Sequence, residues 1–147
     1  MNRARVLPSM MAVSAFTVMT GCGGARSATR YTAGPDADFR NAVNAEVRNA
    51  QDQVVLSGTF VEADSGDEDI ERKAMLTATP LDPDAFGEVE VESCRDAGCR
   101  SQEVEFSVAN VQPGAVFRLV IGGKEFATVT TDNRGRANVE RDVPLQR

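Results

Sequence analysis

The stretch that decides the fold runs from Glu88 to Val108 and reads EVEVESCRDAGCRSQEVEFSV. Valine or phenylalanine alternates with glutamate over residues 88–92 and again over residues 103–108. An alternation of period two places the apolar side chains on one face of a β-strand and the charged side chains on the other face. The stretch therefore predicts a hairpin with one buried and one solvated face. Its outward residues Glu88, Glu90 and Glu92 would discourage edge-to-edge association.

Two cysteines lie at the tip of this predicted hairpin. Cys94 and Cys99 are separated by four residues, and pairing of the flanking strands would bring their sulfur atoms together. A redox site would favour a Cys-x-x-Cys spacing, and a zinc site would lack ligands because the chain has no histidine. We therefore expect a structural disulfide, which stabilises the fold by about 2 kcal/mol in the chain-entropy model.

The rest of the chain from Gln53 onward repeats the strand pattern. Glycine, proline and asparagine separate the segments, for example at the hairpin turn Gly122-Gly123. About seven short strands at this spacing predict an all-β fold, an antiparallel sandwich or barrel. Outside the hairpin above, the segments are residues 53–61, 73–79, 116–121, 126–131 and 136–143.

Three turns in the C-terminal half follow one another in a recognisable order. They are Pro113-Gly114, Gly122-Gly123 and the turn from Thr130 to Gly135. In this order the stretch from Glu103 to Glu140 resembles a small immunoglobulin-like module of exported bacterial proteins. The resemblance implies an antiparallel immunoglobulin-like β-sandwich and brings no activity with it.

The N-terminus has the layout of an export signal. Arg3 and Arg5 precede an apolar segment over residues 10–19, and the small residues Thr20-Gly21 follow it. The apolar segment is too short for a membrane-spanning helix, which needs about 20 residues. We therefore expect a signal peptide that is removed.

The cleavage region Met19-Thr20-Gly21-Cys22 resembles the lipobox of bacterial lipoproteins, with Met19 where that family usually has leucine. The resemblance implies a signal peptide over residues 1–21 and lipid attachment at Cys22. Two or more acyl chains then hold the protein stably to a membrane. Gly23, where an aspartate would signal inner-membrane retention, favours the outer membrane of the bacterial cell envelope. An ordinary secretory signal peptide is the alternative.

The segment between the signal peptide and the strands is predicted in two parts. Residues 22–38 are rich in small and polar residues, which predicts a flexible lipidated tether. In residues 39–52, Phe39, Val43 and Val47 share a helical face, although residues 43–47 also alternate as a strand does. We predict a short helix there, followed by the β-sandwich domain over residues 53–147.

Charge and composition exclude several classes of function. The net charge of -6 falls to -8 when Arg3 and Arg5 leave with the signal peptide. Such a surface repels nucleic acid and anionic lipid headgroups. The chain has no histidine, and neither a nucleophile elbow nor a phosphate-binding loop. We therefore expect a protein that is not an enzyme and needs no cofactor.

An acidic stretch supplies the alternative function. Asp64, Asp67 and Asp69 offer hard oxygen ligands of the kind that calcium prefers, although their spacing does not match an EF-hand loop. The main hypothesis is a non-enzymatic, lipid-anchored envelope protein that acts as a protein-interaction or adhesion module. The alternative is a membrane-tethered module for a small ligand or calcium. The oligomeric state and the partner stay open.

Overall fold

The computed structural model describes residues 29–66, 69–96 and 98–145 and contains ten strands and no helix among them. None of these residues belongs to a helix long and apolar enough to cross a membrane. The all-β prediction is confirmed. The strands are β1 Arg30–Ala33, β2 Asn44–Arg48, β3 Val54–Thr59, β4 Val61–Ser65, β5 Asp69–Ala78, β6 Phe86–Cys94, β7 Ser101–Ala109, β8 Val116–Ile121, β9 Lys124–Thr130 and β10 Ala137–Pro144.

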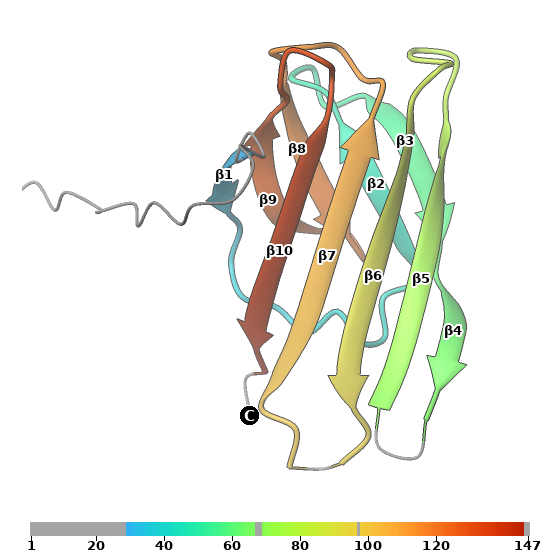
Figure 1. Cartoon of the computed structure of the whole chain (residues 1–147), viewed down its shortest axis with the longest axis vertical. Coiled ribbons are helices and arrows are strands. Elements are labelled where there is room, and N and C mark those ends of the chain that lie inside the picture. The colour runs from blue at the N-terminus through green and yellow to red at the C-terminus, as the bar shows by residue number, and fades with distance from the viewer. Residues whose placement is uncertain (1–28, 67–68, 97, 146–147) are drawn as a thin grey trace, which may run out of the picture.

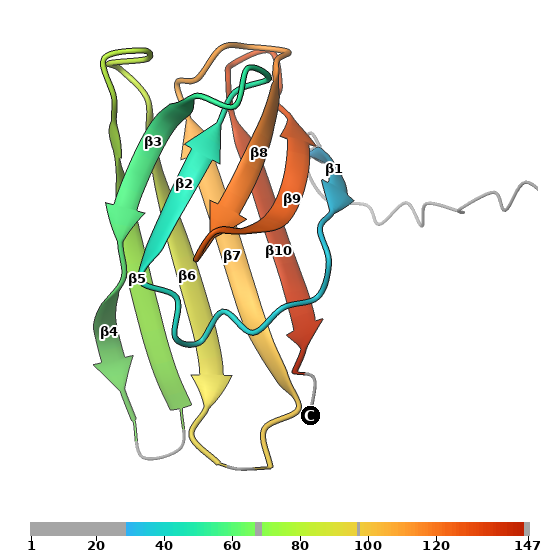
Figure 2. The ribbon, with the colours of Figure 1, turned by 180° about the vertical axis from the view of Figure 1, so that it is seen from behind.

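All strand pairs are antiparallel, and the strands form one continuous path in the order β1-β9-β8-β2-β3-β5-β6-β7-β10, with β4 paired to β5. The path folds into two layers that face each other (Figures 1 and 2). The front layer holds β5, β6, β7 and β10, and the back layer holds β1, β9, β8, β2 and β3. A short pairing between β3 and β5 joins the layers on one side, so the fold approaches a barrel.

The core lies between the two layers. Val89 and Val104 of the front layer and Leu119 of the back layer are fully buried. The rings of Phe106 on β7 and Phe126 on β9 stack across the gap between the layers, with centroids 6.2 Å apart. The alternation of residues 88–108 is therefore confirmed, because its apolar members point into the core while its glutamates point outward.

The connection between β1 and β2, residues 34–43, is here called the strap. It runs below the β8–β9 hairpin and covers the lower inner face of the longer front layer (Figure 2). The strap begins at Gly34, where a Cβ atom would lie 2.2 Å from the carbonyl oxygen of Glu125. Only glycine allows the chain to approach β9 this closely.

One buried glutamine fastens the centre of the strap. Gln102 on β7, which is 1% exposed, accepts a hydrogen bond from the backbone N–H of Phe39 (2.9 Å) and donates one to the carbonyl of Ala37 (2.6 Å). This pairing lets Phe39 enter the core, where its ring meets that of Phe126 edge-on at 5.8 Å. A single side chain therefore satisfies two backbone groups of a segment that has no ladder partner there.

Two arginines hold the ends of the strap. Arg141 on β10 donates hydrogen bonds to the carbonyls of Gly34 (3.3 Å) and Phe126 (2.8 Å), and its guanidinium lies over the Phe126 ring. Arg72 on β5 donates to the carbonyl of Ala42 (2.9 Å). The Arg141 contacts also link β10 to β9, where the sheet has no continuous ladder. The strap is thus bound to both layers.

Three of the predicted segment assignments are wrong. Residues 39–52 form no helix: they contain the end of the strap and β2, which lies between β3 and β8. Pairing on both sides and the inward alternation of Ala45 and Val47 outweigh the helical spacing. The described part of residues 22–38 is not a free tether, because β1 pairs with β9 and the strap is hydrogen-bonded. The β-domain therefore begins at β1 rather than at residue 53, and β1, β2 and β4 raise the strand number from about seven to ten.

We predict that Gln102→Leu lowers the free energy of unfolding by about 2 kcal/mol, because the buried N–H of Phe39 then has no acceptor. Urea unfolding followed by circular dichroism measures the loss. Gln51→Leu is the matched control, since the Gln51 side chain is exposed in the β2–β3 turn and should change stability by less than about 0.5 kcal/mol. An equal effect of the two substitutions would contradict the role of Gln102.

Candidate interaction surface

The predicted site residues fall partly within the described structure. Cys22 and the signal peptide lie outside the described residues. Cys94 and Cys99 are joined at the tip of the β6–β7 hairpin, with Cα atoms 5.7 Å apart, so the predicted disulfide is confirmed. Of the calcium candidates, Asp67 lies outside the described residues, whereas Asp64 is on β4 and Asp69 begins β5.

The outer face of the front layer carries carboxylates in register across four strands. In the first row, Cα pairing places Glu71 of β5, Glu92 of β6, Glu103 of β7 and Asp142 of β10 side by side. No cation interrupts this row. Like charges directly opposite one another across a sheet destabilise it, so the row costs the fold free energy.

The second row lies two residues further along the strands. It contains Lys73 of β5, Glu90 of β6, Glu105 of β7 and Glu140 of β10. Lys73 pairs with Glu90 (3.1 Å) and with a residue of the first row, Glu71 (2.8 Å). The seven acids of the two rows are here called the acidic face: Glu71, Glu90, Glu92, Glu103, Glu105, Glu140 and Asp142.

Most of the acidic face has no neutralising partner within the described part of the chain. Among residues 29–66, 69–96 and 98–145, no ion pair reaches the five acids that follow. These are Glu92, Glu103, Glu105, Glu140 and Asp142. Partial loss of solvent, and then repulsion from Glu140, Asp142, Glu92 and Glu105, raises the pKa of Glu103 above its usual value. The like charges of the acidic face therefore disfavour the ionised form of Glu103, which lies at its centre.

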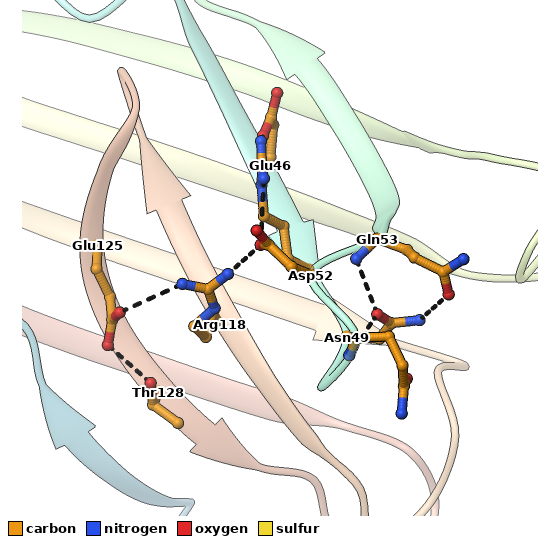
Figure 3. A network of polar contacts seen from close by, with 9 residues as sticks. Glu46, Asn49, Asp52, Gln53, Arg118, Glu125 and Thr128 are labelled. Carbon is orange, nitrogen blue, oxygen red and sulfur yellow. Dashed lines mark hydrogen bonds and ion pairs between the residues drawn. The ribbon is translucent and has the colours of Figure 1, made fainter.

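The outer face of the back layer shows the opposite arrangement. Arg118 on β8 lies between Asp52 and Glu125 and pairs with both (Figure 3). Arg48 on β2 pairs with Glu46 (2.6 Å) and with Asp52 (3.2 Å). Hydrogen bonding from Arg48, against some loss of solvent, lowers the pKa of Asp52. The chain thus balances its charges on one layer and leaves them unbalanced on the other.

A hollow adjoins the acidic face at the upper end of the front layer. Its volume is about 870 Å³, and it is lined by outward residues of β5, β6, β7 and β10 and by the turn before β10. Met75 and Phe86, which are 63% and 55% exposed, contribute its apolar surface. Arg134 and Arg136 lie on its β10 side. The front layer thus presents rows of carboxylates at one end and, at the other, a hollow with exposed apolar side chains and charges of both signs.

The acidic face suits an extended cationic surface better than a single metal ion. Neighbouring carboxylates in a row stand on adjacent strands about 4.8 Å apart and project side by side instead of converging. Across the described parts of the chain, no group of three or more acidic or cysteine side chains could hold a metal ion. No protein-family model, curated protein or solved structure matches the chain.

Sequence reasoning identified the outward glutamates of β6 but missed the rows. The Cys94–Cys99 hairpin was the available signal, because pairing its strands sets Glu92 against Glu103 and Glu90 against Glu105. The extension to β10 had no local signal, since β10 joins β7 from about thirty residues further along the chain.

We predict that the thermal midpoint of the protein rises in low salt as the pH falls from 7 towards 5. The folded-state pKa of Glu103 is raised above the usual 4.5, so the folded state takes up this proton more readily than the unfolded state does. The opposite trend sets in below about pH 4, because the lowered pKa values of Asp38, Asp52 and Asp132 mean that their protonation destabilises the fold. Differential scanning fluorimetry measures both trends.

Glu103→Gln isolates the contribution of the acidic face. At pH 7 this variant should be more stable than the parent by about 0.5 kcal/mol after solvent screening, and its gain should shrink in 0.5 M salt. Its midpoint should also rise less on acidification. Glu62→Gln on β4 is the control, because the Cα register sets exposed Glu62 opposite Arg72, whose side chain points to the inner side of the sheet, away from the acidic face. A gain as large in the control variant would show that net charge, and not the rows, is responsible.

Proposed function

We propose that this protein is a non-enzymatic, lipid-anchored component of the bacterial envelope whose front layer binds another envelope protein. The observation that carries this proposal is the contrast between the two layers. The arginines on the back layer balance its acids, whereas five acids of the front layer have no ion pair among the described residues. A partner that brings cations removes this repulsion when it binds, and charge complementarity speeds and orients the encounter.

The N-terminal region supports export and anchoring. The apolar residues 10–19 and the lipobox-like run ending at Cys22 favour a lipoprotein, and the Cys94–Cys99 bond suits an oxidising compartment. Only seven residues separate Cys22 from Arg30, the first residue of β1. A fully extended chain of this length reaches about 30 Å at most. Acylation at Cys22 therefore keeps the domain close to the membrane, with the outer membrane as the favoured site.

The alternative function, a tethered module for a small ligand or calcium, has weaker support. Among the residues that the structure describes, no group of three acidic or cysteine side chains could hold a metal ion, and the calcium candidate Asp67 lies outside those residues. The hollow could admit a small ligand, but the rows of acids beside it favour a larger cationic partner. For the fold, we propose an immunoglobulin-like sandwich, which the crossings from β7 to β8 and from β9 to β10 between the layers support.

We predict that Cys22→Ala abolishes acylation and leaves an unprocessed or mislocalised precursor whose domain still folds. The measurement is incorporation of an alkyne-labelled fatty acid, together with the intact mass of the membrane-bound protein before and after reduction. The parent should have the mass of residues 22–147 plus acyl groups, and this mass should rise by two protons on reduction. A variant with both Cys94 and Cys99 changed to alanine is the control and should keep its label. An unlabelled, soluble parent would contradict the anchor.

The interaction surface is tested by a photo-crosslinking residue placed at Ser107, beside the acidic face. In the envelope of an expressing bacterium it should give a discrete crosslinked product, and Glu92→Lys combined with Glu103→Lys should abolish that product. The control position is Thr130, exposed at the end of β9 in the back layer. Equal products from both positions, or a product unaffected by charge reversal, would contradict the proposal.

A further inference from the structure

We infer that the partner segment is an extended cationic peptide, with basic side chains at alternate positions followed by one apolar side chain two residues further on. This inference rests on the proposed interaction function and specifies its partner. It draws on the order of outward side chains along the two central strands of the front layer and on the hollow at their upper end.

The carboxylates along β6 are regularly spaced. After the disulfide-bonded Cys94 at its C-terminal end, the outward residues of β6 are, in order, Glu92, Glu90, Glu88 and Phe86. Alternate residues of a strand stand about 6.8 Å apart. A peptide in the same extended conformation repeats its own side chains at the same interval. Three alternate lysines or arginines therefore match three carboxylates, of which Glu90 also contacts Lys73 (3.1 Å), and the next alternate side chain reaches Phe86.

The neighbouring strand β7 shows the same change from acidic to apolar outward side chains. After Ser101 at its N-terminal end, the outward residues of β7 are, in order, Glu103, Glu105, Ser107 and Ala109. Cα pairing aligns this series with β6, so that Glu103 lies beside Glu92 and Ala109 beside Phe86. Both central strands therefore change from acidic to apolar in the same direction, which gives the surface a polarity along the strands.

The hollow completes the apolar end. With a volume of about 870 Å³, it has room for one large side chain beside Met75 and Phe86. Arg134 and Arg136 line the same hollow together with the acids Glu88 and Asp132, so the hollow carries no net negative charge that would attract a cationic side chain. The basic part of the peptide is therefore directed to the acidic rows and its apolar residue to the hollow.

Other occupants of the surface fit less well. A second copy of the chain would set acidic rows against one another and brings a net charge of -6. An anionic lipid surface and nucleic acid are repelled for the same reason. A short polyamine matches the rows but leaves the hollow empty. A cationic peptide with an apolar residue meets both parts of the surface.

The test uses two synthetic peptides and the full lipidated protein in nanodiscs of zwitterionic lipid. One peptide carries three lysines at alternate positions and a leucine two residues beyond, and the other has serine in place of leucine. Dissociation constants are measured by fluorescence anisotropy in 20 mM and 300 mM salt. We expect the leucine peptide to bind about tenfold more tightly, which corresponds to partial burial of one leucine side chain, and both affinities to fall with salt.

Variants assign each part of the peptide to its site. Phe86→Ser should remove the difference between the two peptides without changing the affinity of the serine peptide. Glu90→Gln combined with Glu92→Gln should weaken both peptides about equally, and Glu62→Gln should weaken neither. Phe86 and these acids have outward side chains, so a melting curve of each variant suffices to show that the fold is intact.

The outcomes separate this inference from the proposed function. If both peptides bind equally and the paired glutamine variant weakens them, the acidic face binds cations but the inferred apolar contact is wrong. If neither peptide binds, or the paired glutamine variant binds both as the parent does, the acidic face is not a cation-binding surface. The observation that carries the proposed function then fails as well.

Discussion

The hydrogen bonds between Gln102 and the strap are the constraint on which the rest of the structure depends. The front layer extends below the β8–β9 hairpin, so the lower part of its inner face has only the strap to cover it (Figure 2). An irregular segment can lie against a core only if its backbone groups find partners. Gln102 supplies two of them, and Arg72 and Arg141 supply further donors towards either end. With the strap in place, Phe39 fills the space beside Phe126.

The core and the strap cover the inner face of the front layer. The stability of the fold therefore depends little on which side chains lie on the outer face of this layer. Its side chains can then serve another purpose even where they lower stability. Arg48 and Arg118 neutralise the equivalent face of the back layer, so the same fold can carry a balanced surface. Each pair of carboxylates that stand opposite each other lowers the free energy of unfolding by about a few tenths of a kcal/mol. We interpret this loss of folding stability as the consequence of a surface that serves to bind a cationic partner.

Local patterns predicted the central hairpin and its disulfide, because period-two alternation and the Cys94–Cys99 spacing both lie within one short stretch. They failed for residues 39–52, where Phe39, Val43 and Val47 fit a helical period and only contacts with distant strands decide between strap, strand and helix. A usable signal was nevertheless present. Gln102 and Arg141 each occupy an inward position of an alternating strand, where a polar side chain must find buried partners. The rows of acids needed the non-local pairing of β7 with β10.

The entry of the chain into the fold relates the anchor to the binding surface. Thr29 accepts a hydrogen bond from the backbone N–H of Asn138 on β10 (3.0 Å) and also lines the hollow. Only six residues lie between Cys22 and Thr29. In the proposed anchored state, the hollow is therefore separated from the lipid attachment site by a shorter stretch of chain than the acidic face is. The acidic rows then lie further along the strands from this stretch of chain. A bound peptide would direct its apolar residue towards the anchored end and its cations away from it, which spares the acidic rows close contact with anionic headgroups.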